Sequence, residues 1–432
     1  MLRRKITDTL IQWKNEKKKD CVVVHGVRQC GKTFIIRHFG KTYYQNFIEI
    51  NFVEKPEMIR VFSGNLDVKT LIQGISLLMP EAKFVPGETL IFFDELQECP
   101  AALTSLKFWA EDGQFDVIVS GSLLGLSYKE TSSIPVGYEL PVDMYPLDFI
   151  EFLWALGIDD DFIQELSTYV SGERMIPVSI HETMMKYLRE FLVVGGMPDV
   201  VNTYLETGNF QAVQQTQDKI LRDYQDDIAK YANNADRIKA RACYLSIPKQ
   251  LSKENHKFQY SVVEKKGTAR KFESSVDWLR EAGMIVASYN VSTPAFPLMA
   301  YVKEDQFRVY LSDIGLFTAM FGYQMKDALI SDTLSGPAKG GIYESLIADM
   351  FYKRGENLYY YKREDSSLEI EFLLERNAAV IPVEVKANKG ATRSLNELLK
   401  KDEIEKGYKL TSQNVGISNK KVTLPLYLAA FL

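Results

Sequence analysis

The chain has few cysteines, no long apolar run and no strong excess of charge of either sign. Its four cysteines, Cys21, Cys30, Cys99 and Cys243, lie far apart and form no C-x-x-C pair. This spacing argues against a zinc knuckle or a disulfide framework and is typical of a reducing cytoplasm. No run approaches the roughly 18 apolar residues of a membrane helix, and no apolar segment follows the basic N-terminus. We therefore expect a cytoplasmic protein with neither a signal peptide nor a transmembrane helix.

The weak net charge of −5 excludes a strong overall attraction to nucleic acid, although a local basic surface remains compatible with it. The composition, with 46% hydrophobic and 25% charged residues, is that of a globular protein. At 432 residues the chain is too long for one ordinary core. We expect about three or four domains.

One short stretch, Gly26–Thr33, matches the phosphate-binding pattern G-x-x-x-x-G-K-[ST] in full. The three valines at 22–24 precede it as a buried parallel strand would. Residues 34–38 continue without glycine or proline, as a helix should. A chance glycine-rich turn is the alternative interpretation, and the strand before and the helix after argue against it.

Each residue of the pattern has an expected role in binding ATP or GTP. Gly26 and Gly31 let the backbone turn its N–H groups inward, where they and the helix N-terminus hold an anion. Lys32 is expected to reach the β- and γ-phosphates, and the Thr33 hydroxyl to hold Mg²⁺.

The region around this loop predicts an α/β domain with a parallel sheet covered on both faces. Strands are expected at 22–24, 47–52, 89–94, 117–120 and 139–144, and helices at 2–19, 66–78 and 104–110. The phosphate loop follows the first strand, as a doubly wound sheet requires.

Two acids, Asp94 and Glu95, end the apolar strand at 89–94. A carboxylate beside a phosphate loop holds Mg²⁺, directly or through water, and a second acid orients or deprotonates the attacking water. A solvated strand end is the alternative. Ser120 and Ser122, at the end of the next strand, could sense the γ-phosphate, or they could be ordinary loop serines.

Residues 146–235 read as helices throughout, and we interpret them as a lid and connector. Residues 236–281 then hold 11 Lys and Arg against 6 Asp and Glu, a net of +5. Three helices there and two strands at 285–290 and 306–311 suggest a winged helix. Its third helix carries Arg270, Lys271 and Arg280, which could contact DNA phosphates. A protein–protein module or a merely solvated charged face is equally open from the pattern.

A second constellation of polar residues lies near the C-terminus. Strands at 358–362, 368–374 and 381–386 follow a helix at 342–352 that carries Glu344. Alternation along the strands brings Glu371, Glu384 and Lys386 to common faces, where carboxylates could bind Mg²⁺ and a lysine could stabilise a phosphate. The alternative is a half-exposed sheet with a polar side.

The order of these motifs resembles that of prokaryotic AAA-type ATPases whose C-terminal domain of unknown function is similar to PD-(D/E)xK, restriction-endonuclease-like proteins. The motifs are GVRQCGKT at Gly26–Thr33, FFDELQ at Phe92–Gln97, VSGS at Val119–Ser122, YPLDFIEFL at Tyr145–Leu153, GGMPDVV at Gly195–Val201, LSDIGLF at Leu311–Phe317, YESLIA at Tyr343–Ala348, LEIEFLLE at Leu368–Glu375 and IPVEVKA at Ile381–Ala387. Arg28 and Gln29, which the bare loop pattern does not need, tie the loop to this family.

The resemblance implies a set of site residues. The nucleotide would contact Gly26, Arg28, Gln29, Gly31, Lys32, Thr33, Phe34, Asp94 and Ser120, and Glu95 would direct hydrolysis with Lys32. In the tail, Glu344, Glu371 and Glu384 would bind metal, and Glu371, Glu384 and Lys386 would be catalytic. Two departures stand out: Glu371 replaces the aspartate of relatives, and no arginine occurs near 136–138, where many relatives carry one.

The predicted organisation is an ATP-binding domain at 1–145, a helical lid at 146–235, a winged-helix domain at 236–325 and a nuclease-like α/β domain at 326–432. The predicted function is ATP binding and hydrolysis with Mg²⁺, coupled to a nuclease-like domain that acts on DNA. The alternative is an ATP-dependent switch or scaffold whose tail is catalytically inactive.

Overall fold

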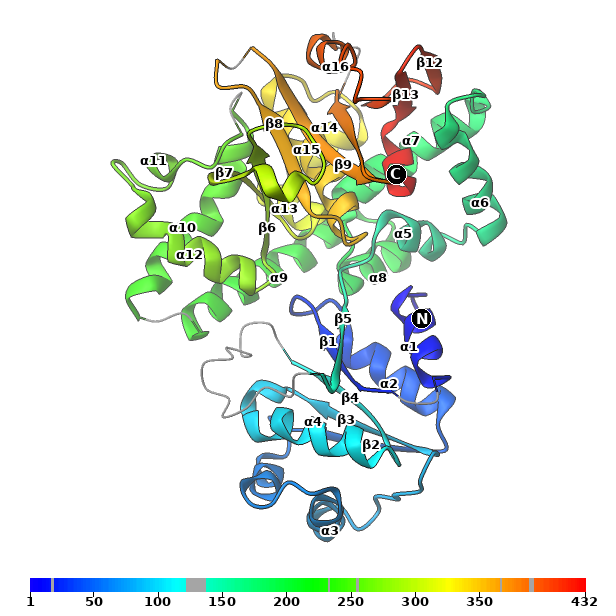
Figure 1. Ribbon diagram of the computed structural model, residues 1–432, viewed down its shortest axis with the longest axis vertical. Helices are drawn as coiled ribbons and strands as arrows, with labels where there is room; N and C mark the ends of the chain where they lie inside the picture. Colours follow the sequence, from blue (N-terminus) through cyan, green and yellow to red (C-terminus); the bar gives the residue numbers. More distant parts are fainter. Residues whose placement is uncertain (17–18, 122–136, 232–233, 254–255, 366, 388–391) are drawn as a thin grey trace. The chain divides into compact units, whose positions relative to one another are not determined.

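The computed structural model describes residues 1–16, 19–121, 137–231, 234–253, 256–365, 367–387 and 392–432. The chain divides into two compact units (Figure 1). The first consists of Met1, Arg3–Tyr145 and Glu281–Gly283, and the second of Leu2, Pro146–Arg280 and Met284–Leu432. Each unit has a sheet of its own.

The first unit is built on a five-stranded parallel sheet with the order β2-β3-β4-β1-β5. The strands are β1 (Cys21–His25), β2 (Asn46–Asn51), β3 (Thr89–Asp94), β4 (Asp116–Ser120) and β5 (Glu139–Asp143). β3 is buried along its whole length, as expected of a strand covered on both faces. The predicted parallel α/β sheet is confirmed.

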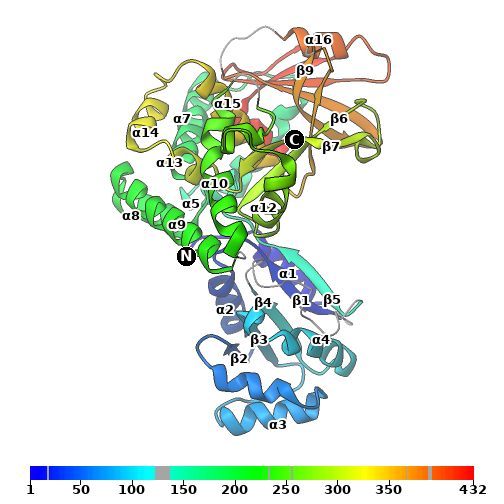
Figure 2. The same ribbon diagram turned by 90° about the vertical axis from the view of Figure 1, so that its left-hand side faces the viewer.

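Helices cover both faces of this sheet, because alternate side chains of each strand point to opposite sides. The helices are α1 (Ile6–Lys14), α2 (Lys32–Tyr43), α3 (Val68–Leu78) and α4 (Pro100–Asp112), with short 3-10 helices η1 (Pro56–Ser63) and η2 (Leu96–Glu98). Val23 and Phe93 share one core with Leu71 of α3 and Trp109 of α4. Figure 2 shows α2 and α4 on opposite sides of the strands.

The second unit contains most of the helices. They are α5 (Phe149–Ala155), α6 (Asp160–Thr168), α7 (Val178–Val194), α8 (Pro198–Thr207), α9 (Phe210–Tyr231), α10 (Asn234–Leu251), α11 (Tyr260–Val263), α12 (Ala269–Glu281), α13 (Ile314–Ala319), α14 (Tyr323–Ile330), α15 (Pro337–Tyr352) and α16 (Arg393–Leu398), with 3-10 helices η3 (Tyr169–Ser171), η4 (Leu298–Tyr301) and η5 (Leu426–Phe431). Among the residues described, no helix is both long and apolar enough to span a membrane.

An eight-stranded mixed sheet organises this unit, with the order β12-β13-β11-β10-β9-β8-β6-β7. The strands are β6 (Ile285–Val291), β7 (Val302–Leu311), β8 (Leu358–Lys362), β9 (Glu369–Arg376), β10 (Ala379–Val385), β11 (Gly407–Thr411), β12 (Gly416–Ser418) and β13 (Lys421–Pro425). α15 packs against β7, β8 and β10, and Leu395 and Leu398 of α16 share a core with Ile370 and Leu373 of β9.

The predicted winged helix is not confirmed by this topology. Helices α10 to α12 and the hairpin β6–β7 are present, but β6 also pairs in parallel with β8 through Ser288, Tyr289 and Asn290. The hairpin is therefore the edge of the eight-stranded sheet and not a free wing, so the expected boundary at 325/326 runs through one sheet (Figure 2). The physical reason is that β6 is buried almost throughout, and its second edge needs a strand to satisfy its backbone groups.

The predicted lid is likewise part of the second unit. α7 packs against α13 and α14, burying Met184, Leu188 and Phe191. Near its start, the His181 ring lies 3.0 Å from the Tyr427 hydroxyl. These helices form a layer of the unit that also holds the C-terminal strands.

Two sequence motifs of the second unit meet at a buried ion pair. Lys353 on α15 lies 3.2 Å from Asp313 and 2.8 Å from Asp349. Asp313 also accepts a hydrogen bond of 2.7 Å from the Gly196 N–H, and Lys353 donates one of 3.1 Å to the Leu147 carbonyl. The motifs at 195–201 and 311–317 therefore position each other.

Candidate functional site

The loop after β1 has the backbone that its glycines predict. A side chain at Gly26 would place its Cβ 2.2 Å from the Met144 carbonyl oxygen, so no larger residue fits without a shift. Gly31 adopts φ 98° at the start of α2, a left-handed conformation that glycine tolerates. The loop thus delivers the chain into the first turn of α2, where helix N–H groups favour an anion.

Lys32 lies across this loop. Its Nζ donates hydrogen bonds of 2.8 Å to the Gly26 carbonyl and 3.1 Å to the Val27 carbonyl. The ammonium group is therefore held against the backbone of the loop itself.

The Asp94 carboxylate is the centre of the site, and it is buried. Thr33 Oγ1 donates to Asp94 Oδ2 over 2.9 Å, and Asn51 Nδ2 donates to the same oxygen over 3.2 Å. The Ser120 hydroxyl donates to the other oxygen, Oδ1. The structure therefore brings together Thr33, Asp94 and Ser120, three of the residues predicted from the sequence.

The sheet order explains this convergence. β4 lies between β1 and β3, and the register pairs Val24 with Ser120 and Asn51 with Asp94. The carboxyl ends of these parallel strands therefore line up at one edge of the sheet. Asn51 was missed in the sequence analysis, although a polar residue at the end of the strand predicted at 47–52 was an available signal.

Glu95 leaves the strand through a strained backbone. Its φ of 55° places a non-glycine residue in the left-handed region, at the start of η2. The Gln97 amide donates to the Glu95 carboxylate, and Glu95 is half-buried. Such strain is found where a side chain must leave the alternation of its strand, and it is typical of functional sites.

The remaining predicted nucleotide contacts lie on the loop and the first turn of α2. Arg28 is exposed, Gln29 adopts a positive φ of 65°, and the Phe34 ring is 62% exposed. Ser122 and Val136, at two positions singled out from the sequence, lie outside the described residues.

The C-terminal constellation is assembled around Lys386. Its Nζ lies 3.2 Å from a carboxylate oxygen of Glu371 and 3.2 Å from one of Glu384. Burial raises the pKa of Glu384 to about 7, against the opposing charge of Lys386. Within the part of the chain that the structure describes, Glu384 Oε2 has no hydrogen-bond partner.

The carboxylate of Glu344, the third predicted acid, is paired with cations of its own. Its oxygens lie 2.7 Å from Arg308 Nη1 and 2.6 Å from His256 Nδ1, and the Tyr310 hydroxyl donates to it as well. Burial would raise the pKa of Glu344, but the charges of Arg308 and His256 outweigh it and hold the pKa well below its usual range.

The predicted metal set of Glu344, Glu371 and Glu384 therefore stays a prediction. Across the described ranges, no group of three or more acidic, histidine or cysteine side chains is arranged to hold a metal ion. The reason is Arg308, a basic residue that β7 brings into the sheet and that the sequence analysis did not single out.

Part of the positive charge of α12, the helix predicted to contact DNA, is paired with acidic side chains of the same unit. Lys271 lies 2.7 Å from Glu264, and Arg280 lies 2.9 Å from Asp277. Arg270 is exposed. Two of the three cations are thus partly neutralised by neighbouring acids.

Comparison with protein families divides the chain into three matched segments. Residues 18–153 match a model described as an AAA domain. Residues 185–327 match a domain of unknown function (DUF8612), and residues 339–429 match another (DUF4143). The first unit is accordingly a P-loop domain of the AAA type, as the sequence resemblance implied, and its loop, strand order and Asp94 agree with a nucleotide-binding role.

Similar proteins were found among archaeal sequences and structures. The chain is 25% identical over 430 residues to the uncharacterized protein MJ1544 of Methanocaldococcus jannaschii, covering 94% of this chain and 81% of that protein. The Walker-type ATPase paby2304 of Pyrococcus abyssi is 14% identical with a TM-score of 0.45, covering 74% of this chain and 96% of that one. The Aeropyrum pernix ORC1 protein, solved in complex with DNA, is 12% identical with a TM-score of 0.29, covering 77% and 93%.

Proposed function

We propose that the protein binds ATP with Mg²⁺ and hydrolyses it, and that the state of the nucleotide controls binding by the second unit. One observation carries the first part: the Thr33 hydroxyl lies 2.9 Å from the Asp94 carboxylate, beside the phosphate loop. Hydroxyl and carboxylate oxygens are the ligands that Mg²⁺ takes beside nucleotide phosphates. The donor set therefore fits the ion.

Each residue of the site has a role that its geometry supports. When bound, Mg²⁺ supplies positive charge at the β- and γ-phosphate oxygens. Lys32 exchanges its contacts with the Gly26 and Val27 carbonyls for the phosphates. Asn51 and Ser120 keep the Asp94 carboxylate in one orientation through their hydrogen bonds.

Glu95 is assigned as the residue that orients and deprotonates the attacking water. Its position directly after Asp94, its left-handed backbone and its hydrogen bond from Gln97 support this assignment. A positioned general base of this kind contributes about 10²–10⁴-fold to a rate. Arg28, Gln29 and Phe34 are assigned to contacts with the nucleotide from the loop and the helix start.

The test measures binding and turnover separately. Titration with a fluorescent ATP analogue reports binding, and release of inorganic phosphate reports hydrolysis. Lys32→Ala is expected to abolish both, whereas Glu95→Gln retains binding and loses turnover. Lys41→Ala, an exposed lysine at the other end of α2, is the matched control and leaves both unchanged. Failure of the wild type to bind the analogue would overturn the proposal.

For the tail we propose binding without nucleic-acid cleavage, the second of the two functions expected from the sequence. The specific observation is that both oxygens of Glu344 are taken by Arg308, Tyr310 and His256. The remaining carboxylates share one lysine, so the donor set is incomplete for a metal and we derive no cleavage step.

Incubation of the wild type with single-stranded, duplex and branched DNA in Mg²⁺ or Mn²⁺ tests this assignment. We expect no cleavage, and unchanged ATP turnover in Glu384→Ala. Cleavage by the wild type that Glu384→Ala loses would show that the tail is a nuclease. The same DNAs also test DNA binding through α12. A lower affinity for DNA in Arg270→Ala would indicate that this residue contacts DNA.

A further inference from the structure

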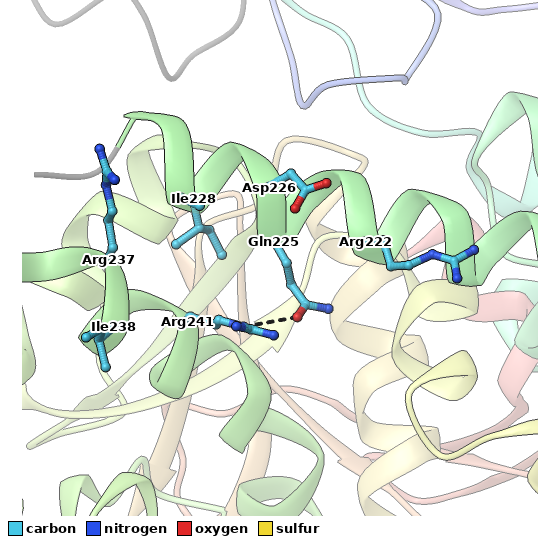
Figure 3. Close-up of a pocket in the computed structure, with 8 residues that line it drawn as sticks. Arg222, Gln225, Asp226, Ile228, Arg237, Ile238 and Arg241 are labelled. Carbon is cyan, nitrogen blue, oxygen red and sulfur yellow. Dashed lines mark hydrogen bonds between the residues drawn. The ribbon is translucent and has the colours of Figure 1, made fainter. Parts of the chain in front are cut away.

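A groove runs along α9 in the second unit, outside all the sites described so far. Its first part is a hollow of about 360 Å³ between α9 and α10, lined by Arg222, Arg237, Arg241 and Ile238 among others. Arg241 Nε donates a hydrogen bond of 3.1 Å to Gln225 Oε1 within it (Figure 3).

A second hollow, of about 560 Å³, continues the groove towards α14. It shares Arg222 and Gln225 with the first, and it is also lined by Leu245 and Tyr323. Because the two hollows have these side chains in common, they form one continuous surface. We call this surface the α9–α10 groove.

The α9–α10 groove exposes large apolar side chains to water. Ile238 is 80% exposed, Leu245 is 45% exposed and Tyr323 is 40% exposed. Ile238, Arg241 and Leu245 stand at positions i, i+3 and i+7 of α10 and therefore on one helix face. Exposed aliphatic groups cost free energy in proportion to their area, and gathered in one place they mark an interaction surface.

Cations flank these apolar side chains. The first hollow carries three arginines against one acid, Asp226. Figure 3 shows Arg237 and Arg222 extending at opposite ends of the hollow, with Arg241 between them. The second hollow contains one acid, Asp218, whose carboxylate accepts a hydrogen bond of 2.8 Å from the Gln214 amide. The positive charge of the groove is thus greatest in the first hollow, which Ile238 also lines.

We propose that the α9–α10 groove binds an acidic amphipathic peptide segment of a partner protein. Aliphatic side chains of the peptide would cover Ile238 and Leu245, and its carboxylates would pair with the guanidinium groups of Arg222 and Arg241. Arginine suits this role because its planar group binds a carboxylate through two hydrogen bonds.

The apolar side chains favour a peptide over nucleic acid. A phosphodiester backbone would satisfy the arginines but would leave Ile238 and Leu245 uncovered. Nucleic-acid grooves commonly add aromatic rings on which bases stack. Among the residues described as lining this groove, one aromatic side chain, Tyr323, is exposed, so the groove offers few rings for bases to stack on.

A synthetic peptide tests the proposal on the full chain. A fluorescein-labelled peptide of about 15 residues, four helical turns, carries leucine at positions i, i+3 and i+7 and glutamate elsewhere. We expect saturable binding by fluorescence anisotropy, weakened about tenfold by Arg241→Ala and by Ile238→Asp, as for residues central to an interface. Both side chains are exposed, so melting temperatures should stay at the wild-type value.

Three controls make the result decisive. Arg393→Ala removes an exposed arginine of the same unit that lines neither hollow, and it should bind the peptide like the wild type. A peptide with lysine in place of glutamate should not bind. Single-stranded and duplex oligonucleotides are titrated alongside the peptide.

The proposal is overturned if the acidic peptide does not bind. It is also overturned if the lysine peptide binds equally well, or if Arg241→Ala and Ile238→Asp bind the acidic peptide like the wild type. Binding of oligonucleotide that Arg241→Ala loses, without binding of the peptide, would identify the groove as a nucleic-acid surface instead.

Discussion

Lys353 Nζ lies 3.2 Å from Asp313 Oδ2, and both side chains are completely buried. Removing one partner of a buried ion pair leaves the other charge unpaired, which costs about 3–5 kcal/mol. We therefore expect Lys353→Met to lower the free energy of unfolding by about that amount, measured by urea denaturation.

Lys186→Met is the matched control for this change. Lys186 pairs with Glu190 at 3.8 Å, but its side chain is 68% exposed. An exposed pair contributes less than about 1 kcal/mol. If the two substitutions had equal effects, the buried pair would not be a structural centre of the second unit.

Gly26→Ala should impair nucleotide binding. The new Cβ would lie 2.2 Å from the Met144 carbonyl oxygen, and the clash would displace the loop. Overpacking of this kind costs roughly 1–3 kcal/mol, which corresponds to about a tenfold or greater loss of ATP affinity in a fluorescence titration. Gly64→Ala, where no atom lies within 4 Å of the new Cβ, should bind ATP normally.

Asn51→Leu should slow ATP hydrolysis. The substitution removes the donor that lies 3.2 Å from Asp94 Oδ2 while keeping a similar volume. A hydrogen bond to a charged group contributes about 1.5–3 kcal/mol, so we expect roughly a tenfold lower rate of phosphate release. Asn46→Leu, at the other end of β2, is the control, and an equal loss there would argue against a role for Asn51 in orienting Asp94.

Lys386→Met should destabilise the protein, because the buried carboxylate of Glu384 and the half-buried carboxylate of Glu371 share this cation. The lysine side chain is 28% exposed, so we expect a loss of about 2 kcal/mol, below that of a fully buried pair. Adding Glu384→Gln to this variant removes one unpaired charge and should restore part of the loss.

A thermal melt with Mg²⁺ separates this structural role from a metal site. An ion that binds the folded state raises the melting temperature by mass action. We expect Glu384→Ala to show the same Mg²⁺ response as the wild type. If Mg²⁺ raised the melting temperature of the wild type but not that of Glu384→Ala, the structural role assigned to these carboxylates would be contradicted.

The stability of the second unit should depend on pH through Lys326. Burial lowers the pKa of Lys326 to about 7, and its Nζ donates to the Val193 carbonyl at the end of α7 over 2.9 Å. Between pH 7 and 10 the unfolded chain therefore keeps a proton that the folded chain has released. The free energy of unfolding must then rise with pH in this window, by about 1.4 kcal/mol per unit at most.

Comparison with Lys326→Met isolates this contribution from other titrating groups. The difference between wild type and variant, from urea denaturation at several pH values, should increase between pH 7 and 10 and stay constant below pH 7. A difference that is flat across the whole range would show that Lys326 keeps its ordinary pKa.

The nucleotide site could be predicted because its determinants are local. The loop Gly26–Thr33 is contiguous, and valines before it and a helix after it reveal its context without any long-range contact. Asp94 followed from one further rule, that parallel strands end at the same edge of a sheet. The same rule could have predicted Asn51, which ends the neighbouring strand β2.

The second unit shows where such rules end. Alternation places Glu371 and Glu384 on faces of strands, but it does not tell which strand lies beside which. The pairing of β6 with β8 turned an expected wing into a sheet edge and thereby brought Arg308 to Glu344. Periodicity is a short-range property, whereas strand order is decided by which apolar faces and backbone edges the whole chain can satisfy together.

The sequence alone therefore determined the phosphate loop, its strand and the acids Asp94 and Glu95, since each depends on neighbours within a few residues or on one shared sheet edge. Only the tertiary structure decided which partners the charged groups of the second unit contact. Whether Glu344 meets a metal or an arginine, and whether Arg241 lines a groove, depends on contacts between segments far apart in the chain.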